Sequence, residues 1–234
     1  MSSNPCLFLP RPQALELQME GFKPGVLFVD TYDQAPAEMS RFRELNPFHV
    51  WPHASLPVPG RPGQWSRSIE GIWQGLKVIS GEMDMRQFDE VPKKRPSDAE
   101  RRRDPAYDYA ASKFRYGDQT LALVKARFLI YAVAYLHLLE HVVSDGLISE
   151  VARARRSGRR VIFFDWDSNG DILDPRFSYS HSSLLANWFN GRLEDALVTP
   201  AESVLSQNEL RHFLTSVDRY TVRYRRVLGE ASHA

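Results

Sequence analysis

Three polar side chains, Glu70, Gln74 and Lys77, recur at a spacing that places them along one face of a helix. A carboxylate can act as a general acid or base, while an amide and an ammonium group can orient a substrate hydroxyl or phosphate. The neighbouring stripe of the same helix is apolar and comprises Ile69, Ile72, Trp73 and Leu76. This pattern fits the wall of a site and also an ordinary solvent-facing helix, and the spacing alone does not choose between them.

A second group of chemically capable side chains follows an apolar run at residues 160–164, which is typical of a buried strand. Asp165, Trp166 and Asp167 come directly after this run, and carboxylates at strand ends commonly bind ligands or catalyse reactions. The acidic spacing also suggests an EF-hand loop. However, loop position 12 would be Arg176, and a strand stands where the entering helix should be, so we expect no metal.

Other motifs give weaker signals. Arg127 shares a helical stripe with two tyrosines, and we expect it to be buried and paired. The order His-x-x-Glu-His at residues 137–141 is a zinc motif in principle, but no third ligand accompanies it. His181 lies beside two serines without the order of a Ser-His-Asp triad, and the sequence contains no phosphate-binding glycine motif. We therefore expect neither a metal nor a cofactor.

The most basic stretch, residues 93–103, contains Lys93-Lys94-Arg95-Pro96 and three consecutive arginines. Such a charge run predicts a solvated, mobile loop, and contact with phosphate or nucleic acid is the alternative. The chain as a whole gives no general argument for nucleic-acid or membrane binding, because its net charge is +1.

Composition indicates an ordinary globular protein of 234 residues, with 43% hydrophobic and 25% charged residues. A single cysteine, Cys6, excludes an intrachain disulfide and favours a reducing compartment. The sequence shows neither a secretion signal nor about 18 consecutive apolar residues. We therefore expect a cytoplasmic protein without a membrane span.

The pattern predicts an α+β fold, mostly helical with a few short strands, in one domain over residues 26–228. A proline-rich N-terminal arm is expected over residues 1–25, and a strand over residues 25–30. Ser66 or Ser68 could cap the first helix. The helices are expected over residues 69–80, 119–142, 145–157, 180–198 and 206–228.

The stretch from Ser68 to Val78 resembles the signature of the NADAR superfamily, also called YbiA-like, which reads Ser-x-Glu-His-x-x-Gln-Ala-x-Lys-Phe. The residues that match in type and spacing are Glu70, Gln74 and Lys77, whereas Gly71 and Gly75 replace the signature's His and Ala. Looser landmarks follow in the same order at residues 42–48, 164–170 and 181–187. The resemblance covers about residues 26–198 and implies a YbiA-like α+β fold.

The resemblance implies an enzyme that cleaves N-glycosidic bonds in ADP-ribosyl or ribosyl-phosphate compounds without a cofactor. Glu70 would be the principal catalytic carboxylate, with Asp165 or Asp167 as its partner across the ribose. The implied substrate-binding residues are Trp73, Gln74, Lys77, Arg127, Trp166 and Asn187. Gly71, in place of the histidine, removes a hydrogen-bonding group and so bears on substrate identity. A catalytically inactive nucleotide-binding module, and a nucleic-acid-directed protein that uses residues 93–103, remain the alternatives.

Overall fold

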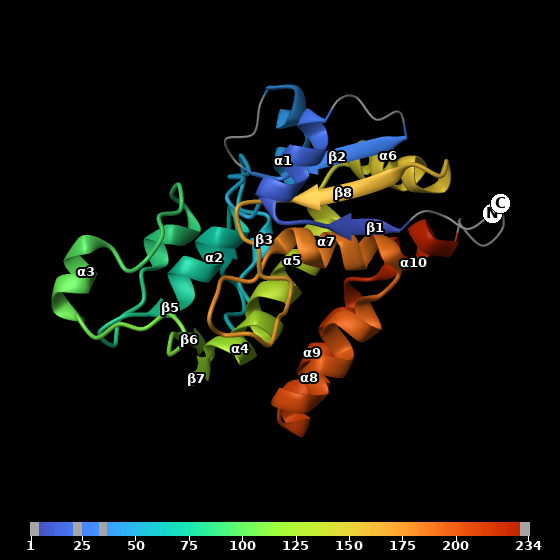
Figure 1. Ribbon diagram of the computed structural model, residues 1–234. Helices are drawn as coiled ribbons and strands as arrows, with labels where there is room; N and C mark the ends of the chain where they lie inside the picture. Colours follow the sequence, from blue (N-terminus) through green and yellow to red (C-terminus); the bar gives the residue numbers. More distant parts are fainter. Residues whose placement is uncertain (1–4, 21–24, 33–36, 230–234) are drawn as a thin grey trace.

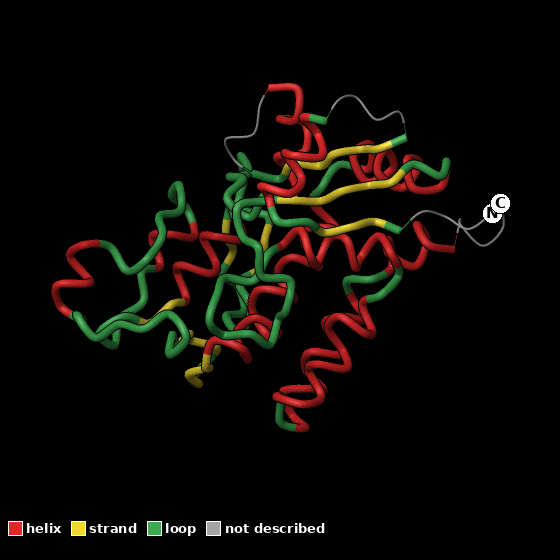
Figure 2. Tube along the Cα trace, viewed as in Figure 1, coloured by secondary structure: helices red, strands yellow, loops and turns green. Residues whose placement is uncertain are grey.

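A parallel sheet of three strands organises the fold, in the order β1-β8-β2. The computed structural model describes residues 5–20, 25–32 and 37–229. The sheet strands are β1 (Cys6–Phe8), β2 (Val26–Asp30) and β8 (Arg160–Phe164), drawn as arrows in Figure 1 and yellow in Figure 2. The strands expected at residues 25–30 and 160–164 are therefore confirmed.

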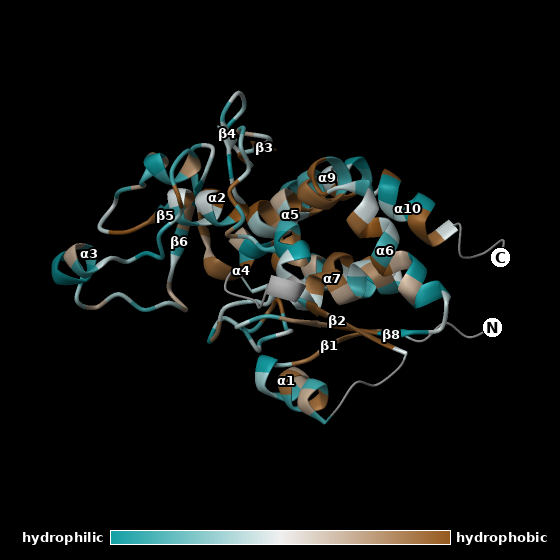
Figure 3. Cartoon of the chain, turned by 90° about the horizontal axis from the view of Figure 1, so that it is seen from above, coloured by the Kyte–Doolittle hydropathy of each residue, from teal (hydrophilic) through white to brown (hydrophobic). Residues whose placement is uncertain are grey.

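Helices cover both faces of this sheet, as Figure 3 shows for α1 (Arg11–Met19) on one side and α6 (Asp145–Arg156) and α7 (His181–Asn190) on the other. Successive side chains of β8 point to opposite faces. Ile162 and Phe164 pack against α1, whereas Val161 and Phe163 belong to the main core. The continuous apolar run of β8 thus follows from burial on both faces.

The described part of the expected N-terminal arm is joined to the domain. Cys6 is buried, and the Asn190 side chain accepts a hydrogen bond from its N–H and donates one to its carbonyl, both at 2.8 Å. β1 pairs with β8 along its whole length. Within the expected arm, Cys6–Phe8 therefore form an edge strand of the sheet, and α1 packs on one of its faces.

One long helical segment runs through the core and carries part of the site. It comprises α4 (Leu123–Ala126), a π-helical turn η3 (Arg127–Ala132), α5 (Val133–His137) and a second π-helical turn η4 (Leu138–Val142). The helix expected from residue 119 starts later. Residues Gln119–Ala122 form β7, which pairs antiparallel with β6 (Lys113–Tyr116) through a turn at Gly117, where φ is 56°.

The segment opposite the sheet is built around α2 (Ile69–Leu76). The Ser68 side chain caps this helix by accepting a hydrogen bond from the Gly71 N–H at 2.9 Å, as expected. The helix ends before residue 80, because Lys77 and Val78 form β5 and pair with β6. The other short elements here are η1 (Ala37–Leu45), β3 (Leu56–Pro57), β4 (Trp65–Ser66), η2 (Met85–Phe88) and α3 (Asp98–Arg103).

The two expected C-terminal helices are each broken. Gly191 adopts a left-handed conformation at the end of α7, with φ at 76°, so residues 194–198 form a separate π-helical turn, η5. The last helices are α8 (Thr199–Val204), α9 (Gln207–Arg219) and α10 (Val222–Gly229).

The whole is one compact α+β domain. In the described chain no single helix is both long and apolar enough to cross a membrane. Leu123–Val142 and Asp145–Arg156 meet that criterion as a pair, by length and composition only, across a bend of 99°.

Candidate functional site

A cavity of about 470 Å³ lies between the parallel sheet and α2. One wall comes from residues that follow β2 and β8, such as Tyr32 and Asp167, and the other comes from α2. Arg127 and Tyr131 line it from the π-helical turn η3. Parallel strands bring their carboxyl ends to one edge, which is where sheets of this kind usually bind ligands.

Eight of the nine candidate residues line this cavity, although they come from three separate segments: Glu70, Trp73, Gln74, Lys77, Arg127, Asp165, Trp166 and Asp167. Asn187 does not. It lies on α7, and its Nδ2 donates to the Ser183 carbonyl at 3.0 Å, within its own helix. The structure therefore gives Asn187 no place among the cavity residues.

The polar row of α2 faces the cavity and is buried. Glu70 is 7% exposed, Gln74 4% and Lys77 3%. Gln74 Nε2 donates to Glu70 Oε1 at 2.6 Å, while Gln74 Oε1 accepts from the Arg95 N–H at 3.0 Å. Lys77 Nζ donates to the Arg95 carbonyl at 3.0 Å. Of the two arrangements that the spacing allowed, the helix thus forms a wall and not a solvent-facing surface.

Burial perturbs the ionisation of both charged groups in this row. It raises the pKa of Glu70, and the Gln74 hydrogen bond and the Lys77 charge oppose that rise. Burial also lowers the pKa of Lys77 from 10.5 to about 8, with the Glu70 charge acting in the opposite direction. A carboxyl and an amine with shifts of this kind in one cavity are typical of catalytic groups.

Asp165 and Asp167, adjacent on the opposite wall, have different surroundings. Asp165 Oδ2 accepts hydrogen bonds from Ser180 Oγ at 2.7 Å and from the Ser182 N–H at 3.1 Å. Its Oδ1 accepts from the Asp167 N–H at 2.6 Å. Its carboxylate also lies 3.0 Å from His181 Nδ1. With hydrogen bonds to both oxygens, Asp165 holds the start of α7 and the acidic turn in place.

The Asp167 carboxylate, by contrast, accepts no hydrogen bond from the described residues. Burial raises its pKa, and the neighbouring Asp165 charge raises it further. His181, Lys94 and Arg127 oppose that rise. Of the two aspartates that the sequence left open, Asp167 is the one with a free carboxyl group in the cavity.

His181 lines the cavity and contacts the buried Thr31, and no role was predicted for either residue. His181 Nε2 lies 2.6 Å from Thr31 Oγ1, so Asp165, His181 and Thr31 form a chain of polar contacts across the ends of β2 and β8. Thr31 is fully buried, and its hydroxyl also contacts Ser182 Oγ at 3.1 Å. The chain therefore fixes this wall. No local pattern could have found it, because its members come from distant parts of the sequence.

Arg127 is buried, as expected, and three of its five N–H donors bind backbone carbonyls, while its Nε has no hydrogen-bond partner among the described residues. Its Nη1 donates to the carbonyls of Ile172 and Asp174 at 2.9 and 2.7 Å. Its Nη2 donates to the Phe177 carbonyl at 2.5 Å. These bonds use the terminal nitrogens to hold the loop that follows the acidic turn. We interpret Arg127 as an anchor of that loop.

The two tryptophans of the cavity also differ. Trp73 is 8% exposed and packs with its ring centroid 4.0 Å from that of Phe114, so it forms part of the core behind the site. Trp166 is 68% exposed and stacks on Tyr32, with centroids 5.8 Å apart. Exposed stacked rings at the mouth of a cavity offer a flat surface for a base.

Gly71 does not line the cavity. A Cβ atom there would lie 2.4 Å from the Gln87 carbonyl oxygen and 2.8 Å from Ser68 Oγ. Close packing of α2 against η2 thus demands glycine at this position. The expectation that Gly71 bears on substrate identity is corrected, because a side chain at residue 71 would point toward η2.

The His-x-x-Glu-His pattern lies elsewhere and serves the fold. Both Glu140 carboxylate oxygens accept from the Arg223 N–H at 2.8 Å, and His137 Nε2 lies 3.2 Å from the Ser55 carbonyl. Within the described ranges, no three His, Cys, Asp or Glu side chains are grouped to hold a metal ion.

Comparison with known proteins gives one match. No curated protein and no solved structure matches the chain. A model of the family DUF6939, described as a family of unknown function, matches residues 13–185. This range contains every residue that lines the cavity. The chain therefore belongs to the DUF6939 family.

Proposed function

We propose that this protein hydrolyses an N-glycosidic bond in an ADP-ribosyl or ribosyl-phosphate compound. The observation that carries the proposal is that Glu70 and Asp167, two carboxyl groups with raised pKa values, share one cavity with lysines and exposed aromatic rings. The likeness of residues 68–78 to the NADAR signature supports the same reaction class.

Hydrolysis of such a bond needs two groups with opposite tasks. Where the leaving nitrogen is neutral, an acid gives a proton to the base as the C1–N bond breaks, and the bonding electron pair leaves with the nitrogen; the cationic nicotinamide of NAD leaves as a neutral base without that proton. A carboxylate stabilises the oxocarbenium-like ribosyl group and accepts a proton from the water that adds to C1. The products are the free base and the ribosyl compound with a hydroxyl at C1.

The surroundings of the two carboxyl groups suggest how these tasks are divided. Glu70 accepts a hydrogen bond from Gln74 and lies near the Lys77 charge, and both favour its ionised form. Asp167 lies beside the Asp165 carboxylate, which resists ionisation of a second acid. We therefore assign the carboxylate role to Glu70 and the acid role to Asp167.

The test is a screen of NAD, ADP-ribosylated nucleosides and ribosyl-phosphate N-glycosides for released base, measured by chromatography. Glu70→Gln should lower the rate on every substrate by about 10²–10⁴, the usual contribution of general acid–base groups, and Asp167→Asn should do so on substrates whose leaving base must be protonated. Asp171→Asn is the matched control, because Asp171 is an exposed acid of the same loop. Full activity of either cavity variant on a substrate whose leaving base must be protonated would refute the assignment.

The alternative of a catalytically inactive binding module predicts a different outcome. Calorimetry would then show saturable binding of ADP-ribose, while no base is released from any compound in the screen. Under the hydrolase proposal, binding and release occur together. We place the reaction in the cytoplasm, because the single cysteine, Cys6, cannot form an intrachain disulfide.

A further inference from the structure

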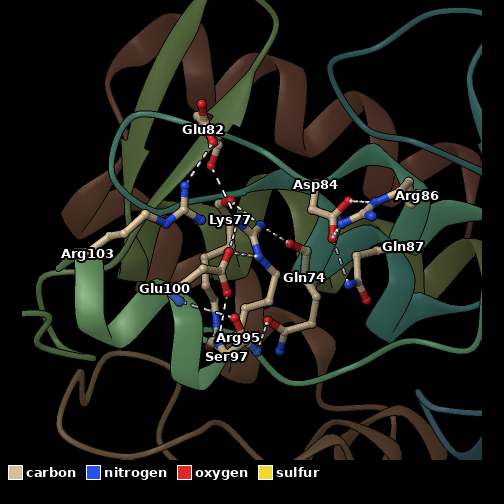
Figure 4. A network of polar contacts seen from close by, with 10 residues as sticks. All are labelled: Gln74, Lys77, Glu82, Asp84, Arg86, Gln87, Arg95, Ser97, Glu100 and Arg103. Carbon is tan, nitrogen blue, oxygen red and sulfur yellow. Dashed lines mark hydrogen bonds and ion pairs between the residues drawn. The ribbon is translucent and has the colours of Figure 1, made fainter.

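The basic segment at residues 93–103 is fastened to the site and is not a free loop. Arg95 is 7% exposed, and its Nη1 donates to the carbonyls of Gln74 and Lys77 at 2.8 and 2.7 Å. Its Nε donates to Glu100 Oε1 at 2.7 Å (Figure 4). The backbone of Arg95 also binds the side chains of Gln74 and Lys77. The expectation of a mobile loop is therefore wrong for this segment.

Glu100 fixes the following helix in the same network. It bridges Arg95 and Ser97, because its Oε2 accepts from the Ser97 N–H at 2.7 Å. Ser97 Oγ accepts from the Glu100 N–H at 3.3 Å, which completes a capping box at the start of α3. As Figure 4 shows, Arg95 and Glu100 meet beside Lys77 and Gln74. These contacts determine which way the neighbouring residues face.

Lys94 and Arg101 face the cavity as a result, and both line it. Both side chains are exposed, and neither forms an ion pair with a carboxylate of the described residues. The basic residues on either side differ. Arg95 is paired with Glu100, and Arg103 lies 3.5 Å from Glu82 on the surface. Two exposed, unpaired cations thus flank the cavity, whereas the other lysine and arginines that line it, Lys77, Arg95 and Arg127, are buried.

Lys94 lies near the reacting groups. Its charge acts on both Glu70 and Asp167 and lowers their pKa values. Its Nζ lies 5.9 Å from the centre of the Phe48 ring, which also lines the cavity. Arg127 also lines the cavity, but it is buried and its terminal nitrogens bind three backbone carbonyls, while its Nε lacks a hydrogen-bond partner among the described residues. The exposed positive charges available to an anionic substrate are therefore those of Lys94 and Arg101, with the Lys77 amine deeper inside.

We propose that Lys94 and Arg101 form an anion-binding wall that holds the phosphate or diphosphate of the substrate. This inference rests on the proposed function and names the residues that would bind the phosphate of its substrate. Arg presents a planar fork of donors and Lys a compact charge, which together suit two neighbouring phosphate oxygens. A nucleic-acid surface would instead use the whole basic face, including Lys93 and Arg102, neither of which lines the cavity.

The experiment compares two double variants that remove equal charge from the same segment. Lys94→Ala/Arg101→Ala removes the cavity cations, and Lys93→Ala/Arg102→Ala removes exposed neighbours that face elsewhere. Calorimetry would measure binding of ADP-ribose, ribose 5-phosphate, inorganic pyrophosphate and adenosine. We expect Lys94→Ala/Arg101→Ala, the cavity double, to bind phosphorylated ligands about tenfold more weakly for each residue replaced. Each lost contact is a charged hydrogen bond. The control double should stay within about twofold.

Adenosine binding should be the same in the wild type and both doubles. Arg101→Lys, which keeps the charge, should retain most of the ADP-ribose affinity that Arg101→Ala loses. Thermal melts would show that each variant is folded, as expected for exposed side chains.

Equal losses in the two doubles, as general attraction or nucleic-acid binding would produce, would overturn the inference. So would a wild-type protein that binds none of the three phosphorylated probes. Selective loss in the cavity double without any base release would uphold the anion wall while refuting hydrolysis. Base release that is unaffected in the cavity double would refute the anion wall while supporting hydrolysis.

Discussion

Replacement of Lys77 by Met tests whether the amine is as deeply buried and as closely coupled to the site as the structure indicates. A pKa of about 8 in the folded protein, against 10.5 for a free lysine, means that burial of the charged amine costs about 3 kcal/mol of stability. The substitution removes that cost and also removes the Lys77–Arg95 hydrogen bond, whose net value is about 1 kcal/mol. At pH 7, Lys77→Met should therefore be about 2 kcal/mol more stable than wild type.

The direction in which stability changes with pH depends on whether the folded or the unfolded state holds the proton of Lys77. Between pH 8 and pH 10.5 the unfolded chain keeps the proton of Lys77, whereas the folded protein has lost it. The stability of the lysine form rises through this window, because the unfolded state binds more protons. The advantage of Lys77→Met should consequently be largest below pH 8 and should shrink as pH approaches 10.5.

Urea unfolding at intervals from pH 7 to pH 10, with linear extrapolation, would measure this difference. Both proteins should carry Glu70→Gln, so that titration of Glu70 does not contribute. Lys93→Met, on an exposed side chain, is the matched control, and its stability curve should follow that of the parent. A Lys77→Met variant that is less stable than its parent at pH 7, or a difference that does not vary with pH, would refute the reasoning.

Two further variants test other parts of the site. Gly71→Ala should lower stability by about 1–3 kcal/mol, because the added Cβ would lie 2.4 Å from the Gln87 carbonyl oxygen, and a thermal melt would show the loss. A melting temperature at or above that of wild type would contradict the packing argument. Trp166→Ala should leave stability nearly unchanged but raise KM about 5- to 100-fold for substrates that carry a base, the range expected for loss of one stacked ring. Equal effects on ribose 5-phosphate binding would show that Trp166 does not stack on a base.

Burial of ionisable groups in the site lowers the stability of the folded protein, and close backbone packing around the site offsets that loss. Glu70 and Gln74 lie on α2, of which every residue from Ile69 to Leu76 is buried, whereas the buried Lys77, expected on the same helical face, follows that helix in β5. Gly75 repeats the arrangement of Gly71, because a Cβ there would lie 2.3 Å from the Phe88 ring. Two glycines on one face allow α2 to lie close to η2, while the polar row on another face lines the cavity.

Local sequence patterns were enough to predict those elements whose structure depends only on their own residues. The strands at residues 25–30 and 160–164 and the helix at residues 145–157 were predictable, because apolar runs and helical periodicity specify them. The boundaries that failed depend on distant partners. Residues 119–122 are a strand because they pair with β6, and α2 ends at Leu76 because Lys77 pairs with Phe114.

The sequence by itself determined that Glu70 and Gln74 share one side of a helix and that two aspartates follow a buried strand. Both facts need only the period of a helix and the order of residues along the chain. The tertiary structure alone decided that the two groups line one cavity, that Asp167 is free while Asp165 is bound, and that Lys94 and Arg101 face inward. These outcomes depend on contacts between segments far apart in sequence, such as Asp165 with His181 and Arg95 with Glu100 and α2, and no local pattern encodes them.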